Sequence, residues 1–167
     1  AFAVYVTRMS LEKIITGGQT GVDRGTLDVA LELGFPCGGS CPADRAAEDG
    51  MIPPRYPLTP LPGGGYRERT LQNVLDSDGT VIISRGPLTG GTLLTRDLCR
   101  HNARPHLVID APVTTEADAA REIARFIEQH DIRVLNVAGP RSSQWHEAHA
   151  FASRTVRELL SDQPRRL

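Results

Sequence analysis

Apolar positions along the chain alternate between short continuous runs and longer stretches with helical spacing. Short runs rich in β-branched and apolar residues predict strands at residues 11–16, 35–39, 80–84, 106–110 and 133–138. Apolar residues recurring every three or four positions predict helices at residues 23–33, 66–75, 92–102, 115–130 and 144–160. Strands that alternate with helices favour right-handed crossovers. The pattern therefore predicts a doubly wound α/β fold, with a mainly parallel sheet and helices on both faces.

Local signals mark the ends of two predicted helices. Gly34 directly follows the helix at residues 23–33 and is typical of a helix C-terminus, because glycine adopts a left-handed conformation without strain. At the helix over residues 115–130, either Thr114 or Thr115, close to Glu116, can serve as the N-cap.

Residues 40–65, called the flap from here on, interrupt this alternation. Prolines and a run of glycines are too frequent in this segment for a regular element to be predicted. They are Pro42, Pro53, Pro54, Pro57, Pro60, Pro62 and Gly63–Gly65. A flexible linker is one interpretation. The chain shows no second core on either side of this segment, so we favour an ordered flap over the binding site.

Three glycine-rich loops follow predicted strands: loop 1 (residues 16–24), loop 2 (residues 84–92) and loop 3 (residues 136–143). Glycine lets backbone N–H groups approach an anion, and the start of a helix adds partial positive charge. The predicted ligand-binding residues are Gly17, Gly18, Gln19, Thr20, Gly21, Asp23 and Arg24 in loop 1, Arg85, Gly90, Gly91 and Thr92 in loop 2, and Gly139, Arg141 and Ser142 in loop 3.

Each loop taken alone is also explained as a tight turn that ends in a helix cap. Asp23 in particular could cap the following helix or accept a hydrogen bond from a ribose hydroxyl. Three such loops, all following strands of one parallel sheet, favour a single site at the carboxyl ends of those strands. We therefore predict that they bind one phosphate-bearing ligand, a nucleotide or a pterin.

Two familiar nucleotide-binding motifs do not fit these loops. Loop 1 lacks the Gly-x-Gly-x-x-Gly spacing of dinucleotide-binding dehydrogenases. Loop 2 has four residues between Gly86 and Gly91, as in a Walker loop, but Thr92 stands where the lysine is required. An ordinary dehydrogenase and a P-loop ATPase are both disfavoured.

The combined motifs resemble the putative molybdenum carrier family. They are Thr16-Gly-Gly-Gln-Thr-Gly-Val-Asp-Arg24, Ala47-Glu-Asp-Gly50 with Ile52-Pro53, Asn73 with Asp76-Ser77-Asp78, Ser84-Arg-Gly-Pro-Leu-Thr-Gly-Gly-Thr92 and Asn136-Val-Ala-Gly-Pro-Arg141. The resemblance extends from about residue 14 to residue 160. The family is itself similar to a permuted form of the Rossmann-like SLOG superfamily, which includes the Lonely-guy phosphoribohydrolases.

This resemblance implies a Rossmann-like sheet and a ligand similar to molybdopterin, the molybdenum cofactor or a nucleotide. It also adds Glu48 and Asp49 of the flap to the expected ligand-binding residues. Hydrolases of the superfamily carry Gly-Gly-x-Gly-Thr-x-x-Glu, and here Thr95 stands at the glutamate position. Threonine cannot act as a carboxylate base, so a carrier is favoured over an enzyme. The alternative is a nucleotide N-glycosidic or phosphoester hydrolase that uses Asp23, Glu48 or Asp49.

Composition limits the remaining choices. A chain of 167 residues suits one domain, which we place at residues 9–162, with an upstream extension at 1–8 and a tail at 163–167. A net charge of −1 and the lack of a long apolar run disfavour nucleic-acid and membrane partners. Three cysteines favour reduced thiols in a cytoplasmic protein, and their spacing predicts no metal site. We also expect a homo-oligomer.

Overall fold

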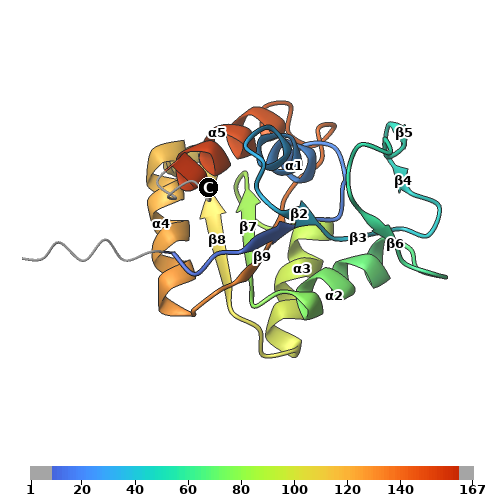
Figure 1. Cartoon of the computed structure of the whole chain (residues 1–167), viewed down its shortest axis with the longest axis horizontal. Coiled ribbons are helices and arrows are strands. Elements are labelled where there is room, and N and C mark those ends of the chain that lie inside the picture. Colours follow the sequence, from blue (N-terminus) through green and yellow to red (C-terminus); the bar gives the residue numbers. More distant parts are fainter. Residues whose placement is uncertain (1–8, 162–167) are drawn as a thin grey trace, which may run out of the picture.

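A computed structural model describes residues 9–161, so the extension and the tail expected from the sequence lie outside the described residues. The central sheet contains β1 (Lys13–Ile15), β2 (Cys37–Gly38), β7 (Gly79–Ser84), β8 (His106–Asp110) and β9 (Val134–Ala138). Their order is β2-β1-β9-β7-β8, and every neighbouring pair is parallel. The predicted parallel sheet is confirmed, and its strands all end at the same edge (Figure 1).

Five helices cover the two faces of this sheet (Figure 1). One layer holds α1 (Val22–Glu32), α4 (Glu116–Gln129) and α5 (Ala148–Ser161), and the other holds α2 (Tyr66–Asp76) and α3 (Gly90–His101). Because both faces are covered, every residue of β7 is buried. The doubly wound α/β fold predicted from the alternation of strands and helices is therefore confirmed.

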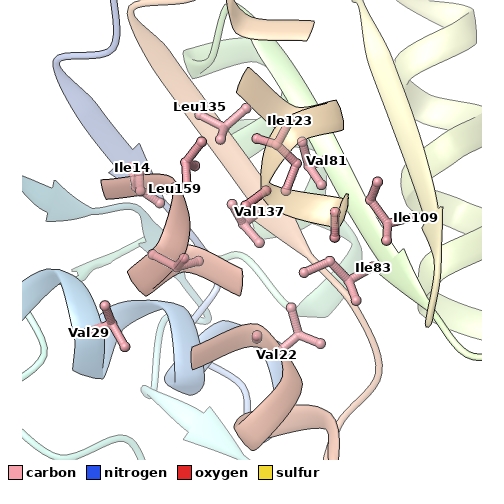
Figure 2. Close-up of a cluster of buried hydrophobic side chains, with 14 of the residues drawn as sticks. Ile14, Val22, Val29, Val81, Ile83, Ile109, Ile123, Leu135, Val137 and Leu159 are labelled. Carbon is pink, nitrogen blue, oxygen red and sulfur yellow. The ribbon is translucent and has the colours of Figure 1, made fainter. Parts of the chain in front are cut away.

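The main core lies between the sheet and the layer of α1, α4 and α5. Val81, Leu135 and Val137 point from the strands into it, and Ile123 and Leu159 meet them from α4 and α5 (Figure 2). A smaller cluster on the opposite face joins α2 to α3. Burial of these side chains supplies most of the driving force that holds the strands in their order.

Several element boundaries differ from the prediction, and β1 begins at Lys13, two residues after its predicted start. Helix α3 begins at Gly90, two residues before the predicted start, and β2 is shorter than residues 35–39. Helix α5 begins at Ala148 and not at residue 144, because the N–H groups of Gln144 and Trp145 both donate to the Arg141 carbonyl in a separate turn. The predicted N-cap Thr115 is confirmed, since its hydroxyl accepts a hydrogen bond from the Asp118 N–H at 3.1 Å.

The flap is an ordered segment that packs against α1. Contrary to the prediction, it contains regular pairs. They are a parallel pair of β3 (Ser40–Cys41) with β6 (Thr59–Pro60) and an antiparallel hairpin of β4 (Ala46–Ala47) with β5 (Gly50–Met51). Each strand has only two residues, a length that the surrounding prolines still permit. Ile52, Tyr56 and Leu58 bury their side chains against Leu27 of α1.

Arg45 gives the flap its internal order. Its guanidinium donates hydrogen bonds of 3.0–3.2 Å to four backbone carbonyls, those of Ile52, Pro53, Tyr56 and Leu58. These carbonyls come from a stretch in which prolines have removed many of the backbone donors that would otherwise pair with them. One arginine side chain thus supplies the donors that the backbone of the flap lacks.

We expect Gly139→Ala to destabilise the fold. A Cβ atom at this position would lie 2.5 Å from Val22 Cγ2 and 2.7 Å from the Ile83 carbonyl oxygen, so loop 3 would have to move away from α1 and β7. Overpacking of this kind lowers the free energy of unfolding by about 1–3 kcal/mol, which urea denaturation measures.

Gly91→Ala is the matched control for this experiment. A Cβ atom at Gly91 meets no atom within 4 Å, and its φ angle is not in the left-handed region. Its free energy of unfolding should stay within about 0.5 kcal/mol of that of the native chain. Equal losses in the two variants would contradict the steric explanation.

Candidate functional site

A cavity of about 120 Å³ lies at the edge of the sheet where β1, β9 and β7 end. Because these strands are neighbours, loops 1, 3 and 2 follow one another along that edge. Six of the residues predicted from the sequence line the cavity, and every loop contributes two of them: Gln19 and Asp23, Gly91 and Thr92, and Gly139 and Arg141. The three loops therefore meet around one cavity.

Helix α2 supplies a wall that the sequence analysis missed. Tyr66, Arg69 and Thr70 line the cavity and lie at positions i, i+3 and i+4, on one face of the helix. The Arg69 guanidinium rests on the backbone of Gly17, where a Cβ atom would lie only 2.1 Å from Arg69 Nη1. The helical spacing was visible in the sequence, but the same pattern is typical of a solvated helix face.

Asp23 is the one carboxyl group in the wall of the cavity. Its side chain is buried, and its Oδ2 accepts a hydrogen bond from the Gln19 N–H at 3.1 Å. Burial raises the pKa of Asp23 to about 6, against the opposing effects of Arg69, the Gln19 and Gly17 N–H groups and Arg24. The cavity thus contains a carboxyl group that gains or loses its proton close to neutral pH.

The start of α3 closes the cavity on the side of loop 2. Gly91 and Thr92 belong to its first turn, where the helix dipole places partial positive charge. The Thr89 N–H donates to Thr92 Oγ1 at 3.3 Å, and the Thr92 N–H donates to the Thr89 carbonyl at 3.2 Å. Thr95 also lines the cavity, and its hydroxyl donates to the Gly91 carbonyl at 2.8 Å. The partial positive charge of this helix start therefore lies at the cavity wall.

Glu48 lies outside the cavity wall, at the junction of loops 1 and 3. Its carboxylate accepts hydrogen bonds from the Thr20 hydroxyl, from the Ser143 N–H at 3.1 Å and from the Ser143 hydroxyl at 2.5 Å. The Ser142 N–H donates to Thr20 Oγ1 at 3.1 Å. Partial desolvation raises the pKa of Glu48, but the hydrogen bonds from Ser143 and Thr20 and the charge of Arg141 outweigh it and lower that pKa overall.

Arg24 and Asp49 pair with each other outside the cavity wall. Arg24 donates through Nη2 to Asp49 Oδ1 at 2.8 Å, through Nη1 to Asp49 Oδ2, and through Nε to the Gly18 carbonyl at 3.1 Å. This hydrogen-bonded pairing is the main cause that lowers the pKa of Asp49. The pair ties the flap to α1, so both predicted ligand-binding residues act as a brace in this structure.

The other predicted residues shape loops 1 and 2 without lining the cavity. Gly18, Gly21 and Gly90 have φ angles of 78°, 82° and 49°, in the left-handed region that favours glycine. A Cβ atom at Gly21 would lie 2.4 Å from the Pro140 carbonyl oxygen, so loops 1 and 3 approach closely only because this residue has no side chain. Arg85 is an exposed residue of loop 2.

The described part of the chain offers no cluster of three or more His, Cys, Asp or Glu residues that could hold a metal ion. Cys37, Cys41 and Cys99 are free thiols, and none of them lines the cavity. Within residues 9–161, no helix is both long and apolar enough to cross a lipid bilayer.

Comparison with known proteins places the chain in a family. Residues 14–160 match the model of the circularly permutated YpsA SLOG family. The chain is also similar to a putative molybdenum carrier protein from Syntrophus aciditrophicus SB, solved by crystallography at 1.45 Å resolution. The identity is 42% and the TM-score 0.89, over 92% of this chain and 97% of that one. No curated protein matches the chain.

We expect Asp23→Asn to gain stability relative to the native chain as the pH rises. Because burial raises the Asp23 pKa from 3.8 to about 6, the folded chain keeps a proton between these values that the unfolded chain has released. Ionisation of Asp23 costs more free energy in the folded chain than in the unfolded chain. The free energy of unfolding therefore falls as the pH rises above 3.8. The full cost of this ionisation, on the order of 3 kcal/mol, is present above pH 6. Urea denaturation of both chains at pH 4 and pH 7.5 measures this change.

The comparison of the two chains at each pH removes the contribution of all other titrating groups, because both chains share them. A difference in unfolding free energy that is identical at both pH values would contradict a raised Asp23 pKa.

Proposed function

The chain belongs to the circularly permutated YpsA SLOG family, and we propose that its cavity binds a small phosphate-bearing molecule and carries it unchanged. The ligand is a phosphorylated pterin, such as the molybdenum cofactor, or a nucleotide. Similarity to the molybdenum carrier protein from Syntrophus aciditrophicus SB supports the first of these. The phosphate group is the part that both share.

The charge of the cavity wall carries this proposal. Two guanidinium groups, Arg69 and Arg141, line a cavity that has one carboxyl group, Asp23. The first turn of α3 adds the partial positive charge of a helix start at Gly91 and Thr92. Excess positive charge beside backbone N–H groups is the environment that stabilises a phosphate.

The volume of the cavity suggests how such a ligand lies. At about 120 Å³, it is smaller than the roughly 300 Å³ at which pockets for complete small molecules begin. It therefore suits the phosphate end of the ligand, while the pterin or base lies at the mouth. Tyr66, which is 47% exposed and belongs to the wall, offers an aromatic face there.

The wall fits the phosphate of the molybdenum cofactor and supplies no sulfur ligand for the metal. Arg69, Arg141 and the start of α3 would hold the phosphate, and no lining residue is a cysteine. The redox chemistry of the metal is the contribution of the cofactor in the enzymes that use it. The residues of this chain bind and orient the phosphate.

A carrier fits the wall better than a hydrolase. Thr95 stands at the position where the resemblance expects a catalytic glutamate, and it lines the cavity. Its hydroxyl is engaged with the Gly91 carbonyl, and a neutral threonine provides no carboxylate for acid–base chemistry.

We expect Arg69→Gln to weaken binding of a phosphorylated ligand. The substitution removes a cation from the cavity wall while keeping a side chain of similar length. Loss of one charge-assisted hydrogen-bonding partner costs about 1.5–3 kcal/mol, or roughly 10- to 150-fold in Kd. Isothermal titration calorimetry with GMP, and with molybdenum cofactor released from a molybdoenzyme, measures this change.

Arg67→Gln is the matched control, because Arg67 is exposed on the same helix and does not line the cavity. It changes the net charge equally and should leave Kd unchanged. If neither ligand binds the native chain, or if both variants lose affinity to the same extent, the proposal is wrong.

One observation favours a second function, that of a nucleotide N-glycosidic or phosphoester hydrolase. Asp23 is a buried carboxyl group in the cavity wall with a pKa of about 6, close to the value at which an acid–base catalyst works best near neutral pH. It could protonate a leaving group that lies in the cavity.

A panel of nucleoside monophosphates and NAD derivatives tests this second function by release of base or phosphate. If Asp23 is the catalyst, we expect Asp23→Asn to lower kcat by roughly 100-fold or more, and kcat in the native chain to depend on a group titrating near pH 6. Asp97→Asn, an exposed carboxylate on α3, is the control that should leave turnover unchanged. Turnover that survives Asp23→Asn excludes this residue.

A further inference from the structure

Two of the three acidic residues of the flap lie at the tip of its hairpin. Ala47 of β4 pairs with Gly50 of β5, so Glu48 and Asp49 are the two residues of the turn. The tip reaches the edge of the sheet, where Glu48 contacts loops 1 and 3 and Asp49 contacts Arg24 of α1. A carboxylate has thereby been brought to the place where two of the glycine-rich loops meet.

The groups around the Glu48 carboxylate are those that bind oxyanions. The Thr20 hydroxyl and the N–H and hydroxyl of Ser143 donate to it, and Arg141 Nε lies 3.9 Å from its Oε2. Hydroxyls, a backbone N–H and a guanidinium together form a typical phosphate-binding set. Glu48 is a surface residue, but its side chain is only 19% exposed because these donors cover part of it.

This donor set adjoins the cavity. Arg141 lines the cavity and also approaches Glu48. Gln19 lines it too, and its Oε1 accepts a hydrogen bond from the Glu48 N–H at 2.9 Å. A ligand with its phosphate near Arg141 would therefore lie beside the donors that Glu48 occupies.

We propose that Glu48 fills an oxyanion subsite formed by Thr20, Ser143 and Arg141, and that an oxyanion group of the ligand displaces it and releases the hairpin tip. The inference rests on the proposed function, because it names a second part of the same binding site and its regulation. Each donor that loses the carboxylate gains a phosphate oxygen, so the exchange leaves no buried donor unpaired.

The remaining contacts of the flap allow the tip to move without loss of the whole segment. Arg45 continues to hold the carbonyls of Ile52, Pro53, Tyr56 and Leu58 at the base of the flap. The pair of Arg24 and Asp49 also lies at the tip, and the Asp49 side chain is 49% exposed. Arg24 is only 10% exposed and would keep an unpaired charge if Asp49 left, so the release is confined to Glu48 and the pair of Arg24 and Asp49 stays in place.

Glu48→Gln tests the displacement directly. Glutamine has nearly the same shape but no charge, so it competes more weakly for the donors. We expect inorganic phosphate to bind Glu48→Gln about tenfold more tightly than the native chain, measured by equilibrium dialysis with labelled phosphate. Glu128→Gln, an exposed carboxylate on α4, removes the same charge elsewhere and should leave phosphate affinity unchanged.

A second substitution locates the gain. Adding Ser143→Ala to Glu48→Gln removes one donor of the subsite, and we expect phosphate affinity to return to about the native value or below. A gain that persists in this double variant would show that phosphate binds elsewhere, which overturns the proposal.

Hydrogen exchange provides a measurement on the native chain, without any substitution. The Glu48 N–H is protected by its hydrogen bond to Gln19, so displacement of the tip should raise its exchange rate severalfold when phosphate is added. If phosphate slows this exchange, or if Glu48→Gln leaves affinity unchanged or weaker, Glu48 is a permanent brace and the inference fails.

The two proposals fail in different ways. If binding of a phosphorylated ligand depends on Arg69 while Glu48→Gln leaves phosphate affinity unchanged, the proposed function is supported and the displacement of Glu48 is wrong. The opposite result is that Glu48→Gln binds phosphate more tightly through Ser143, while no phosphorylated pterin or nucleotide binds in a manner that depends on Arg69. In that case the oxyanion subsite is supported and the proposed function is wrong.

Discussion

The backbone hydrogen bonds that hold β1, β9 and β7 side by side decide where the three glycine-rich loops meet. The last strand of the sequence lies between the first and β7, and Asn136 pairs with both Ile15 and Thr80. Loop 3 is consequently placed between loops 1 and 2. Gly139 then fits against α1 and β7 because it has no side chain, and Arg141 reaches the cavity. Both proposed subsites follow from this order of strands.

Local pattern was enough to predict most of the elements and the three loops, because strand and helix periodicity are properties of short segments. The order of the strands is a matter of contacts between distant segments, such as Lys13 with Val134, and no short-range pattern encodes it. The same limit applies to the site. Gln19 and Arg141 were predicted from their loops, whereas Arg69 was not, because only the packing of α2 shows which face of the helix meets the cavity.

Three carboxyl groups near the site behave differently because their surroundings differ. Asp23 is buried in the cavity wall, and its pKa is raised to about 6. The pKa values of Glu48 and Asp49 are lowered by the donors that surround them. Residue type alone suggested the same role for all three. The structure separates one group that can change protonation state near neutral pH from two that stay ionised and hold the flap.

The prolines of the flap have a consequence for the rate at which the site resets. Five of the flap's six prolines follow the hairpin, between Pro53 and Pro62, and fix φ in the base of the flap, so a hairpin tip freed from Thr20 and Ser143 moves on a stiff base. Once the ligand has left, a chain segment this stiff remains near its docked position. Return of Glu48 to its donors is then a short local search.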